Sequence, residues 1–251
     1  MDLGIAGRSA IVCASSKGLG RACATALAQA GCKVIVNGRD GATAQATAQA
    51  IRAATGAEIA VVAGDVGDPQ VREALLAACP EPDILVNNNG GPPPAPFEAI
   101  TREKLLAGIE ANMLTPIALA QAVLPDMAAR KFGRVVNITS ASVRAPIAGL
   151  DVSSGARAGL TAFLASAARK YARDNVTINS IQPGVFDTDR IRSAIGGDPD
   201  KIAQRKAGVP AGRFGEPAEF GALCAFLCSV HAGYIAGQNI LIDGGAFPGA
   251  F

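Results

Sequence analysis

Short apolar runs alternate with longer amphipathic or Ala-rich segments along most of the chain. The apolar runs predict strands at 9–13, 33–37, 58–62, 83–87, 133–139, 177–182 and 239–242. The segments between them predict helices at about 19–30, 42–54, 68–79, 101–129, 152–173 and 215–229. Strands so continuously apolar suit a parallel sheet that helices cover on both faces. The pattern therefore predicts an α/β fold of Rossmann type, a doubly wound parallel sheet of about seven strands with right-handed crossovers.

No linker-like composition or charge run divides the chain. Its 251 residues are 49% hydrophobic and 18% charged, which permits a sizeable core. We therefore expect one domain over residues 1–251. The segment 185–214 mixes Gly, Pro and charges between a predicted strand and a predicted helix, and a loop of this length usually has a function. We expect a mobile lid over the substrate there, with room for a short helix.

Composition excludes several classes of protein. The net charge of +2 is too small to indicate a nucleic-acid or membrane surface. The N-terminus lacks a basic segment followed by a long apolar core, so we expect no signal peptide and a cytoplasmic protein. The apolar stretch 220–237 is broken by polar residues and glycines, which favours a buried helix and its exit turn over a membrane span. The six cysteines lack zinc spacing, so we expect core thiols and no metal.

A glycine turn at 13–20 lies between the first predicted strand and the first predicted helix. Gly18 and Gly20 lack side chains where the backbone must turn and let a ligand approach. The unpaired N–H groups and the dipole at the start of a helix attract a pyrophosphate. A Gly-x-Gly pair alone is weak support, because Gly also caps and turns chains, but strand, turn and helix follow in the required order. The expected cofactor contacts here are Ser15, Ser16, Lys17, Gly18, Leu19 and Gly20.

The end of the second predicted strand bears on the identity of the cofactor. An acidic residue at this place would bind the ribose hydroxyls of NAD, and none occurs before Asp40. Arg39 follows the strand instead, and Lys17 lies in the glycine turn. Two cations suit a 2′-phosphate, so we expect NADP rather than NAD. Ordinary surface positions for both cations remain the alternative.

Two further strand ends carry candidate cofactor contacts. Asp65, followed by Val66, could accept a hydrogen bond from an adenine amino group or could simply cap the helix that opens near Asp68. The segment 87–91 is rich in Asn and Gly, and it could form a backbone wall beside a ribose or could serve only as a turn. The Pro-rich run 92–96 cannot lie inside a helix or a sheet, so we expect a stiff rim over the mouth of the site.

In combination these features resemble the short-chain dehydrogenase/reductase family, and in particular its 3-oxoacyl-carrier-protein reductase-like members. The resemblance covers almost the whole chain. It rests on the glycine turn, Asp65-Val66, Asn87–Gly90, Asn112, Ser140, Gln182-Pro183-Gly184 with Thr188, and 237–245 near the end. It implies cofactor contacts from Asp65, Val66, Asn88, Gly90, Pro183, Gly184 and Thr188. Two departures are small: Ala14 replaces the usual first glycine, and Asn89 replaces an alanine.

The large departure concerns the reaction centre. The family uses an Asn-Ser-Tyr-Lys tetrad, and Asn112 and Ser140 match its first two members. Ser153 stands at the Tyr position and Arg157 at the Lys position. Serine is a far weaker acid than tyrosine, and Arg, with a pKa above about 12, cannot relay protons as Lys can. Losing a general acid typically costs about 10²–10⁴ in rate.

These residues leave more than one function open. We expect an NADP-dependent oxidoreductase acting on a carbonyl or hydroxyl compound of 3-oxoacyl type, with Asn112, Ser140, Ser153 and Arg157 as catalytic residues. The alternatives are a catalytically impaired dinucleotide-binding protein, acting as a sensor or oligomer partner, and a lyase or isomerase on the same fold. Arg157 could also hold the nicotinamide ribose or a substrate carboxylate, and Arg144, Arg190 and Arg192 would face the same mouth, which suggests an anionic substrate. The resemblance further implies a homotetramer.

Overall fold

The computed structural model describes residues 1–249 and places seven parallel strands in one sheet. The strands are β1 (Ser9–Val12), β2 (Lys33–Gly38), β3 (Ile59–Ala63), β4 (Ile84–Asn87), β5 (Gly133–Ile138), β6 (Val176–Pro183) and β7 (Asn239–Ile242). Their order across the sheet is β3-β2-β1-β4-β5-β6-β7, with every neighbouring pair parallel. The predicted doubly wound sheet is confirmed, and each predicted strand lies within one residue of its observed bounds.

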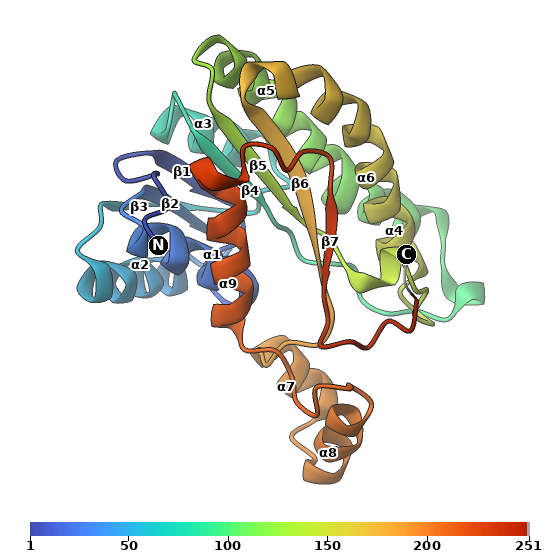
Figure 1. The fold of residues 1–251 in the computed structure, drawn as a ribbon. Helices are drawn as coiled ribbons and strands as arrows, with labels where there is room; N and C mark the ends of the chain where they lie inside the picture. The colour runs from blue at the N-terminus through green and yellow to red at the C-terminus, as the bar shows by residue number, and fades with distance from the viewer. Residues whose placement is uncertain (250–251) are drawn as a thin grey trace.

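Helices cover both faces of the sheet (Figure 1). One face carries α1 (Gly18–Gln29), α2 (Gly41–Thr55) and α9 (Pro217–Cys228). The other carries α3 (Pro69–Ala78), α5 (Thr115–Ala129) and α6 (Asp151–Tyr171), and α4 (Arg102–Ile109) packs against α6. Consecutive strand residues point to opposite faces, so Ile11 belongs to the core under α5 and α6 while Val12 belongs to the core under α1 and α9. The six cysteines are free thiols and all are buried.

The predicted helix 101–129 is observed as two α-helices joined by a π-helical turn, Glu110–Leu114. π-Turns inside helices often mark functional sites, and this one carries Asn112. The whole stretch Arg102–Ala129 is long and apolar enough to cross a membrane, with a mean hydropathy of 1.2 in its most apolar window, which is 44% buried. A core helix passes the same test, and α5 packs against the sheet here.

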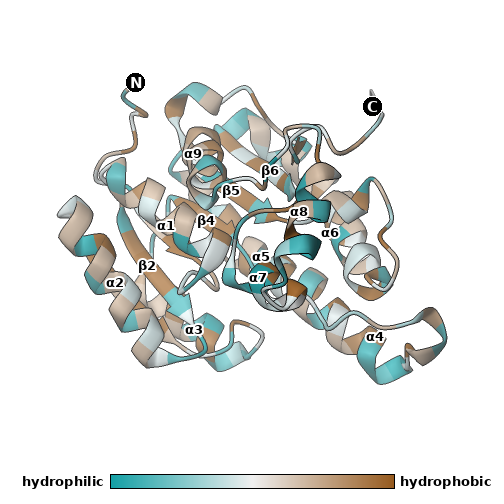
Figure 2. Cartoon of the chain, turned by 90° about the horizontal axis from the view of Figure 1, so that it is seen from below, coloured by the Kyte–Doolittle hydropathy of each residue, from teal (hydrophilic) through white to brown (hydrophobic). Residues whose placement is uncertain are grey.

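The segment 185–214, expected to be a long loop with room for a short helix, contains two short helices. They are α7 (Asp189–Ile195) and α8 (Pro199–Ala207), which lie beyond the carboxyl ends of the strands (Figures 1 and 2). Asp198 caps α8 by accepting from the backbone N–H groups of Asp200 and Lys201. An acidic cap followed by Pro is a helix-start signal that the charges around it obscured.

Candidate active site

The change of direction in the strand order lies between β1 and β4, which are neighbours in the sheet. In a doubly wound sheet this arrangement opens a crevice at the carboxyl ends of the two strands, where ligands bind. The glycine turn follows β1, and the segment 87–91 follows β4. The candidate cofactor and reaction residues therefore come from one edge of the sheet.

The glycine turn has the geometry that a pyrophosphate site needs. Gly18 has φ +56°, and a Cβ at Gly20 would collide with the carbonyl oxygen of Ala14 and lie 2.8 Å from Nδ2 of Asn88. No acidic residue lies in the first turn of α1, and Lys17 at its N-cap leaves the first N–H groups without a side-chain partner. The residues present therefore fit a bound phosphate group at this helix N-terminus.

Asn37 organises this turn, and the sequence did not single it out. Its Oδ1 accepts from the N–H of Ala14 at 2.9 Å, and its Nδ2 donates to the carbonyls of Val62 and Gly64 on the far side of β2. Ser15 is fully buried and exchanges hydrogen bonds with Asn37 through its own N–H and Oγ. A polar residue within an otherwise apolar strand was the available signal. Ser15 thus shapes the turn from inside.

The charges at the end of β2 fit a 2′-phosphate better than a ribose diol. The carboxylate of Asp40 caps α2, accepting from the N–H of Thr43 at 2.7 Å and from its hydroxyl. These hydrogen bonds, with a smaller effect from the charge of Lys17, lower the pKa of Asp40. Arg39 and Lys17 are exposed beside it. Because Asp40 is committed to the helix, the two cations remain for an anionic group.

Asp65 is an exposed carboxylate and does not cap α3. Its Oδ1 accepts from the N–H of Gly67 at 2.8 Å, while Asp68 caps the helix by accepting from Gln70. The capping alternative for Asp65 is therefore wrong, because Asp68 already satisfies the helix end. Val66 is buried and lines the same small cavity as Cys13 at the end of β1.

The loop after β6 returns to the glycine turn. Pro183 ends β6, and the N–H of Gly184 donates to the carbonyl of Ile242 at 2.9 Å. Thr188 is the N-cap of α7, and its methyl carbon lies 3.7 Å from the position that a Cβ would take at Gly18. The fold thus brings together the cofactor residues expected at 183–188 and at 15–20.

The reaction centre is a chain of hydrogen bonds through Asn112, Ser153 and Arg157. Oγ of Ser153 donates to Oδ1 of Asn112 at 3.2 Å and accepts from Nε of Arg157 at 3.1 Å. Nδ2 of Asn112 donates to the carbonyl of Gly90 at 3.1 Å. All three side chains are buried. Three of the four expected catalytic residues are therefore joined by hydrogen bonds, and Ser140 is not part of this chain.

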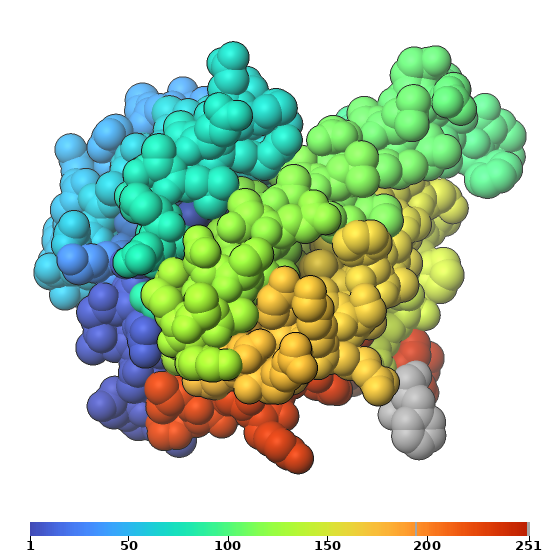
Figure 3. All heavy atoms as spheres, turned by 90° about the horizontal axis from the view of Figure 1, so that it is seen from above, coloured from blue at the N-terminus to red at the C-terminus, as the bar shows by residue number. Residues whose placement is uncertain are grey.

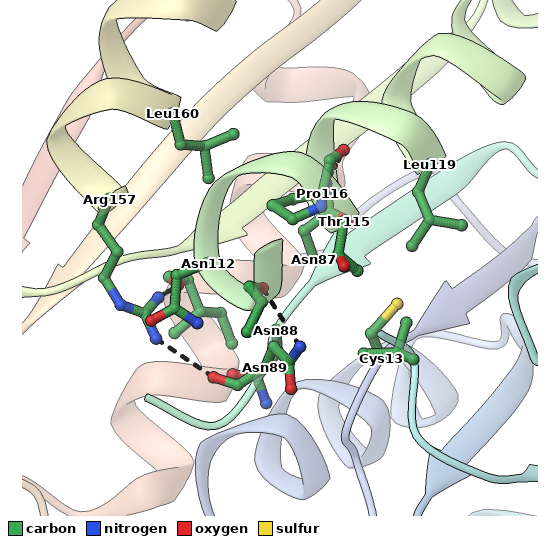
Figure 4. Close-up of a pocket in the computed structure, with 13 residues that line it drawn as sticks. Cys13, Asn87, Asn88, Asn89, Asn112, Thr115, Pro116, Leu119, Arg157 and Leu160 are labelled. Atoms are coloured by element: carbon green, nitrogen blue, oxygen red, sulfur yellow. Dashed lines mark hydrogen bonds between the residues drawn. The ribbon is translucent and has the colours of Figure 1, made fainter. Parts of the chain in front are cut away.

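Arg157 also joins two strand ends (Figure 4). Its Nη1 donates to the carbonyl of Ile138 at 2.5 Å, and its Nη2 donates to the carbonyl of Asn89 at 3.2 Å. Burial lowers the pKa of Arg157 to about 10, and the nearby charge of Arg190 acts in the same direction. Within residues 1–249 no carboxylate forms an ion pair with either arginine. The site therefore carries uncompensated positive charge.

Of the four arginines expected at the mouth, two are engaged elsewhere. Arg144 donates to Oε1 of Gln182 and to the carbonyl of Asn239, and Arg192 forms a bidentate ion pair with Asp187. Arg190 has no such partner in the described part of the chain. Its Nη2 lies 3.5 Å from the position that a Cβ would take at Gly91, and Oγ of Ser153 lies 3.3 Å from the same position.

Ser140 follows β5 and carries a hydroxyl of different character from that of Ser153. Its Oγ accepts from the N–H of Ser142 at 3.1 Å and from Oγ of Ser142 at 2.9 Å. No acceptor for the Ser140 proton is found among residues 1–249, so this O–H can donate to a ligand. The sequence suggested Ser140 for ordering the substrate oxygen and Ser153 for delivering the proton, whereas the structure directs the Ser153 hydroxyl at Asn112 and leaves that of Ser140 free to donate.

A small cavity of about 10 Å³ lies behind the reaction centre. Asn87, Thr115 and Arg157 are among the residues that line it (Figure 4). Oδ1 of Asn87 and Oγ1 of Thr115 are buried and have no hydrogen-bond partner within the described residues. A polar space of this size suits roughly one water molecule.

Comparisons with known proteins agree with this geometry. Residues 13–246 match the protein family described as enoyl-(acyl carrier protein) reductase. The 3-oxoacyl-[acyl-carrier-protein] reductase FabG of Vibrio cholerae is 34% identical over 258 residues, which span 98% of this chain and 99% of that relative. The crystal structure of a 3-oxoacyl (acyl-carrier-protein) reductase from Agrobacterium tumefaciens C58 with NADP bound is 32% identical at a TM-score of 0.91, covering 97% of this chain and 95% of its own. The chain therefore belongs to the short-chain dehydrogenase/reductase family.

The chain is accordingly an NAD(P)-dependent oxidoreductase. Its likeness extends beyond the acyl-carrier-protein reductases. YwfH, described as an NADPH-dependent reductase involved in bacilysin biosynthesis, is 29% identical at a TM-score of 0.92, covering 97% of this chain and all of its own.

Proposed function

We propose that the protein uses NADP to interconvert a carbonyl compound and the corresponding alcohol. The observation that carries this proposal is the placement of the Asn112–Ser153–Arg157 chain at the same strand ends as the glycine turn. The commitment of Asp40 to α2 supports NADP over NAD, because it leaves Lys17 and Arg39 for the 2′-phosphate. Bound NADPH would supply the hydride; the protein residues orient the carbonyl and stabilise the charge on its oxygen.

Ser140 is the proposed donor to the substrate oxygen. The hydroxyl proton of Ser153 is directed at Asn112, so that hydroxyl cannot serve as donor without breaking an existing bond. Arg157 holds its guanidinium on Ser153 and on two strand-end carbonyls, and so supplies a fixed positive charge close to the reacting oxygen. In this arrangement Ser153 and Arg157 position the site, and Ser140 touches the substrate.

The proposed substrate is of 3-oxoacyl type and carries an anionic group. Two of the similar proteins named above, from Vibrio cholerae and Agrobacterium tumefaciens, are described as 3-oxoacyl-carrier-protein reductases, which supports the carbonyl class. The charge supports the anion: Arg157 and Arg190 lie near each other without a carboxylate partner in residues 1–249. A substrate carboxylate beside Gly91 would meet Arg190 directly and would reduce the cost of holding two cations together.

The decisive experiment is a titration of NADPH and NADH by cofactor fluorescence, followed by turnover on a panel of 3-oxoacyl thioesters, 3-oxo acids and simple ketones. We expect tighter binding of NADPH than of NADH and measurable oxidation of NADPH by at least one 3-oxo compound. Binding without any turnover would refute the enzymatic proposal and favour a sensor or oligomer partner. Failure to bind either cofactor at millimolar concentration would refute both.

We also propose a cytoplasmic homotetramer. Large apolar side chains are exposed on α4, on the π-helical turn and on α6, notably Leu106, Leu114 and Phe163, and the segment around α4 projects from the body of the molecule (Figure 3). Val230 and Tyr234, near β7, are exposed as well. These two patches support one interface along the helices and another beside the last strand. Light scattering on the purified protein tests the tetramer, and Phe163→Glu should dissociate it.

A further inference from the structure

Three serine hydroxyls form a continuous hydrogen-bonded line that ends at Ser140. Oγ of Ser154 donates to Oγ of Ser142 at 2.8 Å, and Oγ of Ser142 donates to Oγ of Ser140 at 2.9 Å. Ser142 is 3% exposed, whereas Ser154 is only partly buried. The line therefore leads from a position that water reaches, through a buried hydroxyl, to the hydroxyl left free for a ligand.

Adjacent residues of α6 separate this line from the static chain at the reaction centre. Successive residues of a helix point about 100° apart. Ser153 accordingly points to Asn112 and Ser154 points to Ser142. One serine is fixed between Asn112 and Arg157, and the other donates toward Ser140. The hydroxyls of these two adjacent residues therefore join separate hydrogen-bond networks.

We propose that Ser154 and Ser142 relay protons from solvent to Ser140 and so replace the missing phenol and amine. This inference rests on the proposed carbonyl reduction. As hydride reaches the carbonyl carbon, the π electrons move to the oxygen, and the O–H bond of Ser140 breaks to protonate it. The proton of Ser142 moves to Ser140 and that of Ser154 moves to Ser142. A solvent water then reprotonates Ser154, and the hydroxide left behind is neutralised by bulk solvent, which thus supplies the one proton that the reduction consumes. A concerted shift leaves no serine alkoxide behind, which is essential because serine is a very weak acid.

Within the described residues, neither Arg157 nor either tyrosine can perform this task. Arg157 stays charged at neutral pH, since its pKa of about 10 is well above 7, and its bonded N–H groups face fixed acceptors. Tyr171 lies 18 residues beyond Ser153 on α6, about 27 Å along the axis, and Tyr234 is fully exposed. Ser142 and Ser154 act through Ser140, so they are positioning residues for proton delivery.

The test compares Ser142→Ala, Ser142→Thr and Ser154→Ala with wild type on the best 3-oxo compound. The control is Ser166→Ala, an exposed position on the same helix. We expect Ser142→Ala to lower kcat by about 10–10²-fold, with the larger loss at high pH and an altered solvent deuterium isotope effect. Its affinity for NADPH, measured by fluorescence, should stay unchanged. Ser142→Thr, which keeps a hydroxyl, should restore most of the rate.

Several outcomes would overturn the relay. The relay is refuted if Ser142→Ala has the kcat and the isotope effect of the wild type. It is also refuted if Ser142→Ala and Ser142→Thr lose the same fraction of kcat, because that result would indicate a packing role for Ser142. If Ser142→Ala does not fold, Ser154→Ala is the deciding variant. Ser154 is partly exposed, so a water can take the place of its hydroxyl but should restore only part of the proton transfer. A wild-type protein that reduces no carbonyl compound refutes the proposed function as well. An active wild type with unaffected serine variants refutes only the relay.

Discussion

Nε of Arg157 donates a hydrogen bond to Oγ of Ser153 over 3.1 Å, one helical turn away on α6. The resemblance drawn from the sequence aligns this pair with the Tyr and Lys of the family. In this chain the cation fixes the hydroxyl in place, whereas a cation beside a tyrosine would acidify it. The proton that the carbonyl oxygen gains on reduction must therefore come from a group other than Ser153 and Arg157.

Restoring the usual pair tests this view. We expect Ser153→Tyr combined with Arg157→Lys to raise the rate on a generic ketone by about tenfold or more, because a phenol beside a cation is a usable general acid. The measurement is kcat under saturating NADPH, with both single variants as controls. An unchanged rate would show that substrate geometry limits turnover, and that proton supply does not.

Arg39 should determine the preference for NADPH. Arg39→Gln removes one of the two cations at the end of β2, and loss of a charged contact to phosphate should weaken NADPH binding by about 10–10²-fold while leaving NADH unaffected. Lys33→Gln is the matched control, since Lys33 lies at the opposite end of the same strand and pairs with Glu58. Equal weakening of both cofactors by Arg39→Gln would contradict a 2′-phosphate contact.

Arg190 should select an anionic substrate. A 3-oxo acid and its methyl ester differ by one charge, and we expect wild type to favour the acid in kcat/KM by about tenfold or more. Arg190→Gln should remove that preference. Arg192→Gln should retain it, because Arg192 is paired with Asp187. A wild type indifferent to the charge would disprove the anion site, whatever the variants do.

Ala14 is a strained position, with φ at +43° in the left-handed region. Glycine adopts this conformation without steric cost, so Ala14→Gly should stabilise the protein by roughly 0.5–1 kcal/mol. Thermal or urea denaturation measures the change. Ala53→Gly is the control on the exposed face of α2, where the same substitution should destabilise by up to about 1 kcal/mol. A loss of stability in Ala14→Gly would mean that its methyl group packs better than the strain costs.

Buried thiols should make the protein sensitive to alkali. Burial raises the pKa of Cys13 from 9.0 to about 12, so the folded state keeps this thiol protonated after the unfolded chain has lost its proton. Its contribution is therefore fully present below pH 9 and is lost as the pH rises toward 12, by about 1.4 kcal/mol per pH unit. Urea denaturation between pH 8 and about 10.5 should give a shallower decline for Cys13→Ala. Val86→Ala, a buried change on the neighbouring strand, should keep the wild-type slope.

The sequence predicted the sheet because each of the seven strands contains a short apolar run bounded by polar residues or glycine. It predicted the glycine turn because Gly18 and Gly20 lie where the first strand gives way to the first helix. A short helix was expected within 185–214, but the bounds of α7 and α8 were not, because Gly, Pro and charged residues mask the helical pattern there. The burial of Arg157 was equally hidden. Its carbonyl acceptors belong to Ile138 and Asn89, which are far apart in sequence and meet only when β4 and β5 pair.

The serine relay escaped prediction for a related reason. Ser142 and Ser154 belong to no motif that the sequence analysis identified, and their spacing from Ser140 does not indicate a line of hydroxyls. That line forms because the start of α6 packs against the short helical turn after β5. Short-range patterns locate elements, whereas chemistry that spans elements depends on their packing.

Asn37 anchors the glycine turn to two strands at once, and the turn is consequently stiff before any ligand arrives. A floppy loop must surrender conformational freedom when it closes around a dinucleotide, and that loss is subtracted from affinity. In this protein the glycine turn has already lost that conformational freedom when the chain folds. The coenzyme should therefore bind to a preformed site, with little rearrangement of the backbone between the free and the bound protein.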